Sequence, residues 1–152
     1  MTLQEIRQGI IQLLRSGTDV GYITGEDVSQ AKELPLLQVQ LEPLSFQTAA
    51  AGYFSEKTIL VDISYMEELH TSNAGIYTML EKMDRIFRPF FRIGDRAFTP
   101  DAQINITDDI GHYIFTLHFF DAEEFEPEPL MGELTIRLEK EEDTDGIAGD
   151  TD

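Results

Sequence analysis

The segment that most constrains the fold is residues 112–140, HYIFTLHFFDAEEFEPEPLMGELTIRLEK. Its first part places a large apolar side chain at every second residue, which is typical of a strand with one buried face. These apolar positions are Tyr113, Phe115, Leu117 and Phe119. A second alternation predicts another strand, with Leu134, Ile136 and Leu138 on one face. Nothing in the segment resembles a catalytic motif, so it favours an assembly protein over an enzyme.

A connector rich in acid and proline, residues 121–129, separates these two predicted strands. Its carboxylates and prolines include Glu123, Glu124, Glu126, Pro127 and Pro129. Proline and repulsion between like charges favour an extended arm here. Residues 140–152 contain almost no apolar side chains, which predicts a disordered acidic tail.

Two helices are predicted from apolar residues that recur at steps of three and four. The first covers residues 2–16, and the second covers about residues 72–88. Thr71 or Ser72 is the expected N-cap of the second helix, and Pro89 is expected to close it.

Further strands are predicted at residues 22–23, 37–41 and 57–66, with a short strand or extended turn within 90–97. Pro43 should end the strand at 37–41. Residues 48–52 contain three alanines and a glycine, which predicts a mobile loop. Residues 25–34 are polar enough to form a loop, and residues 108–111, DDIG, suit a hairpin turn.

Together these elements predict an α+β fold, a mainly antiparallel sheet with two helices packed on one face. A chain of 152 residues has room for one domain with a single core. We therefore expect one domain over residues 1–139, in which 121–139 form the arm and final strand. The disordered tail, 140–152, follows it.

Composition excludes several classes of function. The formal net charge is -18, from 29 acidic and 11 basic residues, and such a field repels phosphate backbones. Sequence-specific nucleic-acid binding is therefore disfavoured. The absence of cysteine excludes disulfides, thiolate nucleophiles and cysteine-ligated metals. No apolar run approaches the roughly 18 residues of a membrane span, and no secretory leader is evident, so we expect a soluble chain made in the cytoplasm.

Chemistry-bearing residues do not form a recognised motif. A metal-dependent hydrolase would require Asp108, Asp109 and Asp121 to converge, but none of them lies in a calcium-loop pattern. His70 stands beside Thr71 and Ser72 without the GxSxG sequence of a nucleophile elbow. Since no glycine-rich phosphate cradle occurs either, no cofactor is expected.

Five of the 11 basic residues cluster at the end of the second predicted helix and just after it. They are Lys82, Arg85, Arg88, Arg92 and Arg96. One interpretation is interaction with the helix C-terminal dipole, together with solubility. The other is a docking surface for the acidic surface of another copy or a partner. The sequence leaves both open.

The order of these elements carries a resemblance to a known family. An N-terminal helix (LQEIRQGIIQLL) is followed by a strand that opens with proline (LPLLQVQLEP) and a long strand (KTILVDISY). A helix, the aromatic strand (HYIFTLHFFDA) and the PLMGEL segment complete the order. The chain resembles the small tail terminator, or tail-completion, proteins of long-tailed phages and defective prophages over residues 3–139. The strongest local matches are Phe119-Phe120 and residues 129–134. Gly52-Tyr53-Phe54 is similar to an aromatic motif that family members commonly place before the long strand.

The resemblance implies a non-enzymatic virion protein that forms a ring, typically a hexamer, at the head-proximal end of the tail tube. Such a ring ends tube polymerisation and forms the surface that joins the head. Its implied partners are other copies of itself, the tail-tube protein and a head-completion or connector protein. DNA would only pass through the lumen, and no membrane is involved. The subunit interface is predicted to include Lys82, Arg85, Arg88, Arg92, Arg96, Tyr53, Phe54, Glu123, Glu124, Glu126, Leu134 and Ile136.

An alternative from a different class is an acidic DNA mimic that inhibits a nucleic-acid-binding enzyme. Mimics carry carboxylates on helices at phosphate-like spacing. Much of the charge here instead falls in the connector and tail, which disfavours mimicry.

Overall fold

The computed structural model describes residues 1–25, 34–68 and 72–122 of the chain. The helices and strands are α1 (Leu3–Gly17), β1 (Tyr22–Thr24), β2 (Leu36–Ala49), β3 (Phe54–Met66), α2 (Ala74–Phe87), β4 (Phe91–Ile93), β5 (Arg96–Phe98), β6 (Gln103–Thr107) and β7 (Ile110–Ala122), with a short 3-10 turn, η2 (Ala50–Gly52), between β2 and β3. Neither helix in these ranges is long and apolar enough to cross a membrane.

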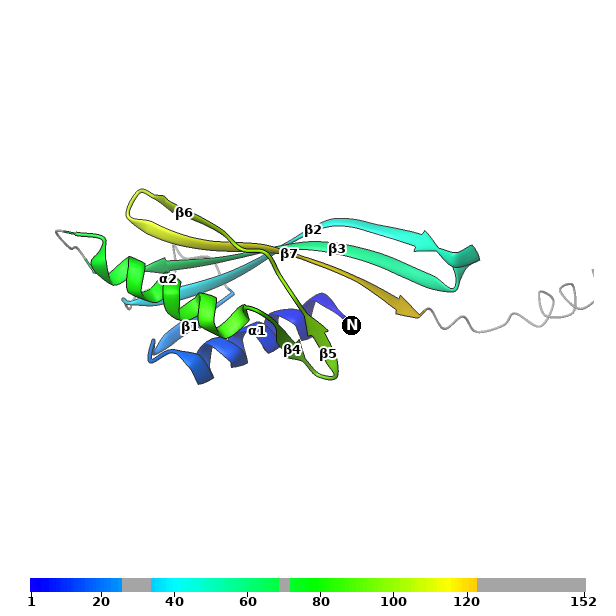
Figure 1. Ribbon diagram of the computed structural model, residues 1–152, viewed down its shortest axis with the longest axis horizontal. Coiled ribbons are helices and arrows are strands. Elements are labelled where there is room, and N and C mark those ends of the chain that lie inside the picture. Colours follow the sequence, from blue (N-terminus) through cyan, green and yellow to red (C-terminus); the bar gives the residue numbers. More distant parts are fainter. Residues whose placement is uncertain (26–33, 69–71, 123–152) are drawn as a thin grey trace, which may run out of the picture. The chain divides into compact units, whose positions relative to one another are not determined.

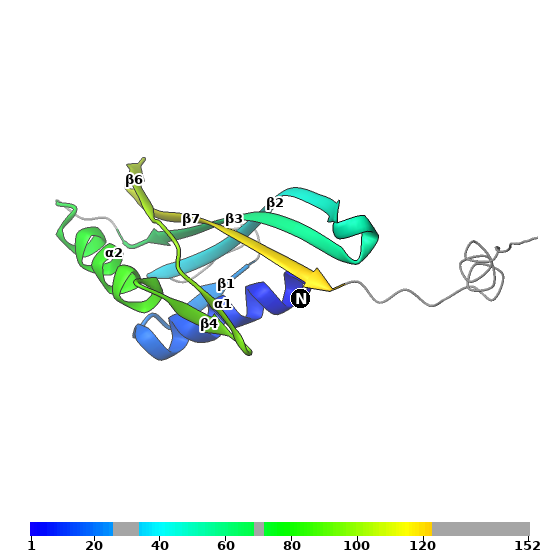
Figure 2. The ribbon, with the colours of Figure 1, turned by 45° about the vertical axis from the view of Figure 1, so that its right-hand side comes forward.

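Five strands form one sheet in the order β1-β2-β3-β7-β6, and β4 and β5 form a separate hairpin (Figure 1). Every pairing is antiparallel except that of β1 with β2. Both helices lie on the same face of the sheet and contact each other (Figure 2). The α+β fold that the sequence predicts is therefore confirmed.

The core lies between the helices and the sheet face that carries alternate residues of β3 and β7. Ile59, Val61 and Ile63 of β3 are fully buried, and the predicted aromatic face of β7 is also buried. Phe87 at the end of α2 contacts the rings of Phe91 and Phe115, at centroid distances of 5.1 and 5.2 Å. Such ring pairs contribute about 0.5–1.5 kcal/mol beyond their area burial, and they connect α2 and β4 to the sheet.

The β2–β3 hairpin is longer than the sequence predicts. Pro43 does not end the strand, because β2 continues to Ala49 and pairs with β3 along its length. Two features permit the proline. A register shift falls between Pro43 and Ser45, and β1 pairs only with the first three residues of β2. Pro43 therefore lies beside a break in the β2–β3 register and beyond the part of β2 that pairs with β1, so its missing N–H deprives β1 of no donor.

The predicted loop at residues 48–52 begins two residues too early for the same reason. Thr48 and Ala49 belong to β2, and only η2 with Tyr53 turns the chain. Ala50, Ala51 and Gly52 have φ values of 53°, 57° and 94°, in the left-handed region. Strand β3 consequently begins at Phe54, three residues before the predicted start.

Other local predictions need smaller corrections. The N-cap position of α2 is Asn73, not Thr71 or Ser72, and its side chain makes no capping hydrogen bond. The chain after Pro89 forms the two-stranded β4–β5 hairpin, which extends one residue past the predicted range of 90–97, to Phe98. The predicted turn before β7 is confirmed, with Asp108 and Asp109 at φ 54° and 63°, as in a type I′ turn.

Strand β7 includes Asp121 and Ala122, so the predicted connector loses its first two residues to the sheet. The remainder of the arm, its strand, the tail and most of the loop at 25–34 lie outside the described residues. The predicted domain boundary at residue 139 therefore stays a prediction.

Candidate interaction surfaces

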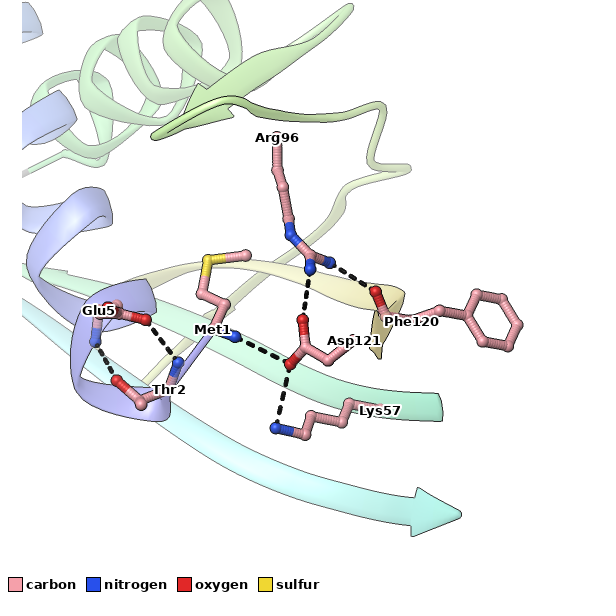
Figure 3. Close-up of polar contacts among 7 residues, drawn as sticks. All are labelled: Met1, Thr2, Glu5, Lys57, Arg96, Phe120 and Asp121. Atoms are coloured by element: carbon pink, nitrogen blue, oxygen red, sulfur yellow. Dashed lines mark hydrogen bonds and ion pairs between the residues drawn. The ribbon is translucent and has the colours of Figure 1, made fainter. Parts of the chain in front are cut away.

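A cluster of three cations surrounds the carboxylate of Asp121 near the end of β7 (Figure 3). Its Oδ2 accepts from the α-amino group of Met1 at 2.9 Å and lies 3.2 Å from Nζ of Lys57 on β3. Its Oδ1 accepts from Arg96 on β5, which also donates to the carbonyl of Phe120 at 2.8 Å. The Asp121 side chain is only 10% exposed. This cluster joins the start of α1, the β4–β5 hairpin and two strands of the sheet.

The pKa of Asp121 is set by the geometry of this cluster. Burial of Asp121 acts to raise its pKa, but the hydrogen bonds from the α-amino group and Lys57 and the charge of Arg96 outweigh burial and lower the pKa. The carboxylate thus stays ionised, as three neighbouring cations require.

The tip of the β2–β3 hairpin carries exposed apolar side chains. Phe46 is 55% exposed, Tyr53 67% and Phe54 41%. The register places Phe46 on the helix-side face, with Lys57 opposite it, and Phe54 on the outer face, opposite Ala122. Residues 45–55 contain no charged side chain. We call residues 45–55 the hairpin tip.

A groove of about 520 Å³ lies between α2 and edge strand β6. Its lining residues are Tyr77, Leu80, Glu81, Asp84, Arg88, Asp101, Ala102 and Ile104. Asp84 accepts from the Arg88 guanidinium at 2.7 Å and from the hydroxyl of the buried Tyr113 at 2.8 Å. The hydrogen bond from Arg88 lowers the pKa of Asp84, while burial raises the pKa of Tyr113. We call this the α2–β6 groove.

The predicted basic cluster is spread over several elements. Lys82 lies 3.8 Å from Asp19, Arg88 pairs with Asp84, and Arg96 pairs with Asp121. Arg85 and Arg92 are exposed. Three of the five cations therefore bind carboxylates of their own subunit. Of the other predicted interface residues, Tyr53 and Phe54 are exposed, whereas Glu123, Glu124, Glu126, Leu134 and Ile136 lie outside the described residues.

The carboxylates of the hydrolase alternative do not converge. Asp108 and Asp109 form the turn before β7, whereas Asp121 lies 12 residues after Asp109 along that strand. At the usual rise per residue this separation is about 40 Å. Within the described ranges, no group of three or more acidic or histidine side chains is placed to hold a metal ion.

The two strand histidines form separate contacts on the outer face of the sheet. Nδ1 of His112 lies 3.0 Å from Asp62 and 3.2 Å from Oγ of Ser64, and His118 contacts Glu56. A serine–histidine–aspartate relay needs the serine and the aspartate on opposite ring nitrogens. Here both contact Nδ1, so this arrangement cannot activate the serine. His70 is outside the described residues.

The DNA-mimic alternative needs rows of carboxylates on helices. The described helices carry three acidic residues, Glu5, Glu81 and Asp84. Glu5 forms the capping box of α1 with Thr2, and Asp84 is paired with Arg88. These helices therefore offer no phosphate-like series.

A family model, "Phage tail terminator protein", matches residues 5–129. Because this match covers well over half of the chain, the chain belongs to the phage tail terminator family. The comparison with curated proteins gave no match. The chain is therefore a structural, virion-associated phage tail protein that interacts with other tail or head components, and the resemblance seen in the sequence is confirmed.

Proposed function

We propose that the chain assembles as a ring, of six copies, on the head-proximal end of the phage tail tube. The ring ends polymerisation of the tube and forms the surface that joins the filled head. Its partners are other copies of itself, the tail-tube protein and a head-completion protein. The observation that carries this proposal is the family match over residues 5–129.

Two features of the structure support a ring. The hairpin tip and the α2–β6 groove are different surfaces, and a ring needs a heterologous interface in which one patch meets a different patch on the next copy. An isologous dimer would instead use one self-complementary patch.

The outer face of the sheet supports a DNA channel. On β2, β3, β6 and β7, the face opposite the helices carries Glu42, Glu56 and Asp62 and no lysine or arginine. The single lysine of these strands, Lys57, points to the helix side, where it pairs with Asp121. A face that carries carboxylates and neither lysine nor arginine repels phosphate, so DNA passing along it would not adhere.

A tube-assembly experiment tests the proposal. Tail-tube protein of the same phage is polymerised with and without the purified chain, and tube lengths and ends are recorded by electron microscopy. We expect added chain to shorten the tubes and to leave a ring at one end. Native mass spectrometry of the released rings should give about six times the chain mass of 17.3 kDa. Tubes of unchanged length with bare ends would overturn the proposal.

A further inference from the structure

We infer that the hairpin tip of one copy docks into the α2–β6 groove of the next copy. This inference rests on the proposed ring and names the contact that would build it. It assigns the protruding part of the hairpin to self-association and not to the tube.

The hairpin tip is a wedge with apolar side chains on both faces. Phe46 and Phe54 are exposed on opposite faces, and Tyr53 follows the turn. The turn itself places two alanines, Ala50 and Ala51, in the left-handed region, where a Cβ is disfavoured. Strain of this kind persists where a particular local shape is required. Here it holds Tyr53 at the far end of the hairpin.

The α2–β6 groove offers a site of suitable size and character. Tyr77 and Ile104 flank it and are 56% and 52% exposed, so apolar surface is already open to water there. Its volume falls within the 300–1,000 Å³ that is common for binding pockets. Aromatic side chains seated in such pockets dominate many interfaces.

A hairpin tip that occupies the groove must come from another molecule. Ile104 of the groove pairs with Tyr113 on β7, whereas Phe54 of the tip pairs with Ala122. These positions are nine residues apart on one strand, or about 30 Å. The tip therefore cannot reach the groove of its own subunit.

Charge favours the hairpin tip over the other surfaces of a second copy. The groove contains Glu81, Asp84 and Asp101 against one cation, Arg88, and the whole chain carries a net charge of -18. Most surfaces of another copy would meet like charge there. The uncharged residues 45–55 avoid this repulsion, and the Tyr53 hydroxyl can donate to a groove carboxylate.

Cysteine cross-linking tests the contact, because the chain contains no native cysteine. The double variant Tyr53→Cys/Ile104→Cys is assembled on tail tubes and treated with a short bis-maleimide reagent. We expect a ladder of covalent oligomers up to ring size. Each single variant, and the matched double variant Tyr53→Cys/Thr107→Cys with its second cysteine on β6 outside the groove, should give no ladder.

The outcomes separate the two proposals. Rings without the ladder would overturn the docking contact and leave the proposed ring standing. If the wild-type chain also leaves the tubes without a ring, both proposals are overturned. Cross-linked dimers from either single variant would show an isologous contact and also overturn the docking.

Alanine substitution gives a second readout. We expect Tyr53→Ala/Phe54→Ala to raise the chain concentration needed for rings by at least about tenfold, the effect of losing one interface hot spot. Phe90→Ala removes a comparably exposed aromatic elsewhere and should leave ring formation unchanged. Equal effects of the two variants would contradict a specific role of the tip.

Discussion

The guanidinium of Arg96 binds the carboxylate of Asp121, although the two residues lie 25 positions apart on β5 and β7. Arg96 is not held by its own two-stranded hairpin alone, because it also donates to the carbonyl of Phe120. The β4–β5 hairpin is therefore connected to the last residues of the described sheet. Lys57 and the α-amino group of Met1 complete the same cluster, so three elements depend on one carboxylate.

Replacing Asp121 by asparagine should destabilise the fold. The neutral amide would keep the shape of the side chain but leave three cations without an anion, and charged hydrogen bonds are worth about 1.5–3 kcal/mol. We expect Asp121→Asn to lower the free energy of unfolding by about 2–3 kcal/mol at pH 7, measured by urea denaturation. Asp95→Asn, an exposed carboxylate next to Arg96, is the control and should change it by less than about 0.5 kcal/mol. Equal losses would show that Asp121 has no special role.

The wild type and Asp121→Asn should also differ in how their stability depends on pH. The folded-state pKa of Asp121 is lowered, so its carboxylate stabilises the fold above the unfolded-state value of about 3.9. This contribution is lost as the pH falls through the folded-state pKa. The stability difference between the two proteins should therefore be constant from about pH 7 to 5 and shrink below about pH 4. A difference that stays constant down to about pH 2 would contradict the ionised cluster.

The alternation of buried and exposed residues along the strands could have located part of this cluster from the sequence. Asp121 continues the odd-numbered buried series of Tyr113 to Phe119, and Lys57 continues that of Ile59 to Tyr65. Two opposite charges at the ends of buried faces indicate an ion pair. The sequence could not have shown that Arg96 belongs to this cluster, because its position depends on the packing of the β4–β5 hairpin against the core.

The long hairpin shows the other limit of sequence reasoning. Pro43 and the small residues that follow are local signals for a strand end and a loop. Pairing with β3 overrides them, since the bulge after Pro43 restores the register. Helix positions, the aromatic face of β7 and the Asp108-Asp109 turn were predictable because each depends on periodicity or turn chemistry within one segment. The α2–β6 groove was not, because it joins elements distant in sequence.

The hydroxyl of Tyr113 gives a test of the hydrogen bond to Asp84, a residue that lines the α2–β6 groove. Tyr113→Phe removes the 2.8 Å hydrogen bond to Asp84 while keeping the ring in the core. We expect a loss of about 1 kcal/mol in the free energy of unfolding, measured in urea. Tyr77→Phe alters an exposed tyrosine at the rim of the same groove and is the matched control. A larger loss for Tyr77→Phe would contradict the assignment.

The hairpin tip should become more stable when its strain is relieved. Ala51 has φ 57°, where glycine has no steric penalty, so Ala51→Gly should raise the free energy of unfolding by about 0.5–1 kcal/mol. Ala49→Gly, at an extended φ of -133°, should instead lower it. Thermal unfolding of both variants measures these two changes in stability, which should have opposite signs. A fall in stability for both would show that the turn conformation is not strained.

Close packing of α2 on the sheet can be tested at Gly111. A Cβ at this position would lie 2.6 Å from Cγ2 of Ile76, a fully buried side chain of α2. Gly111→Ala must therefore displace the helix or the strand, and overpacking of this kind costs about 1–3 kcal/mol. Gly21→Ala is the matched control, because a methyl group at that position would have no atom within 4 Å. Urea denaturation should show a loss for Gly111→Ala alone. An unchanged midpoint would mean that Ile76 can move aside without cost, and that α2 is held less tightly against β7 than the buried contacts indicate.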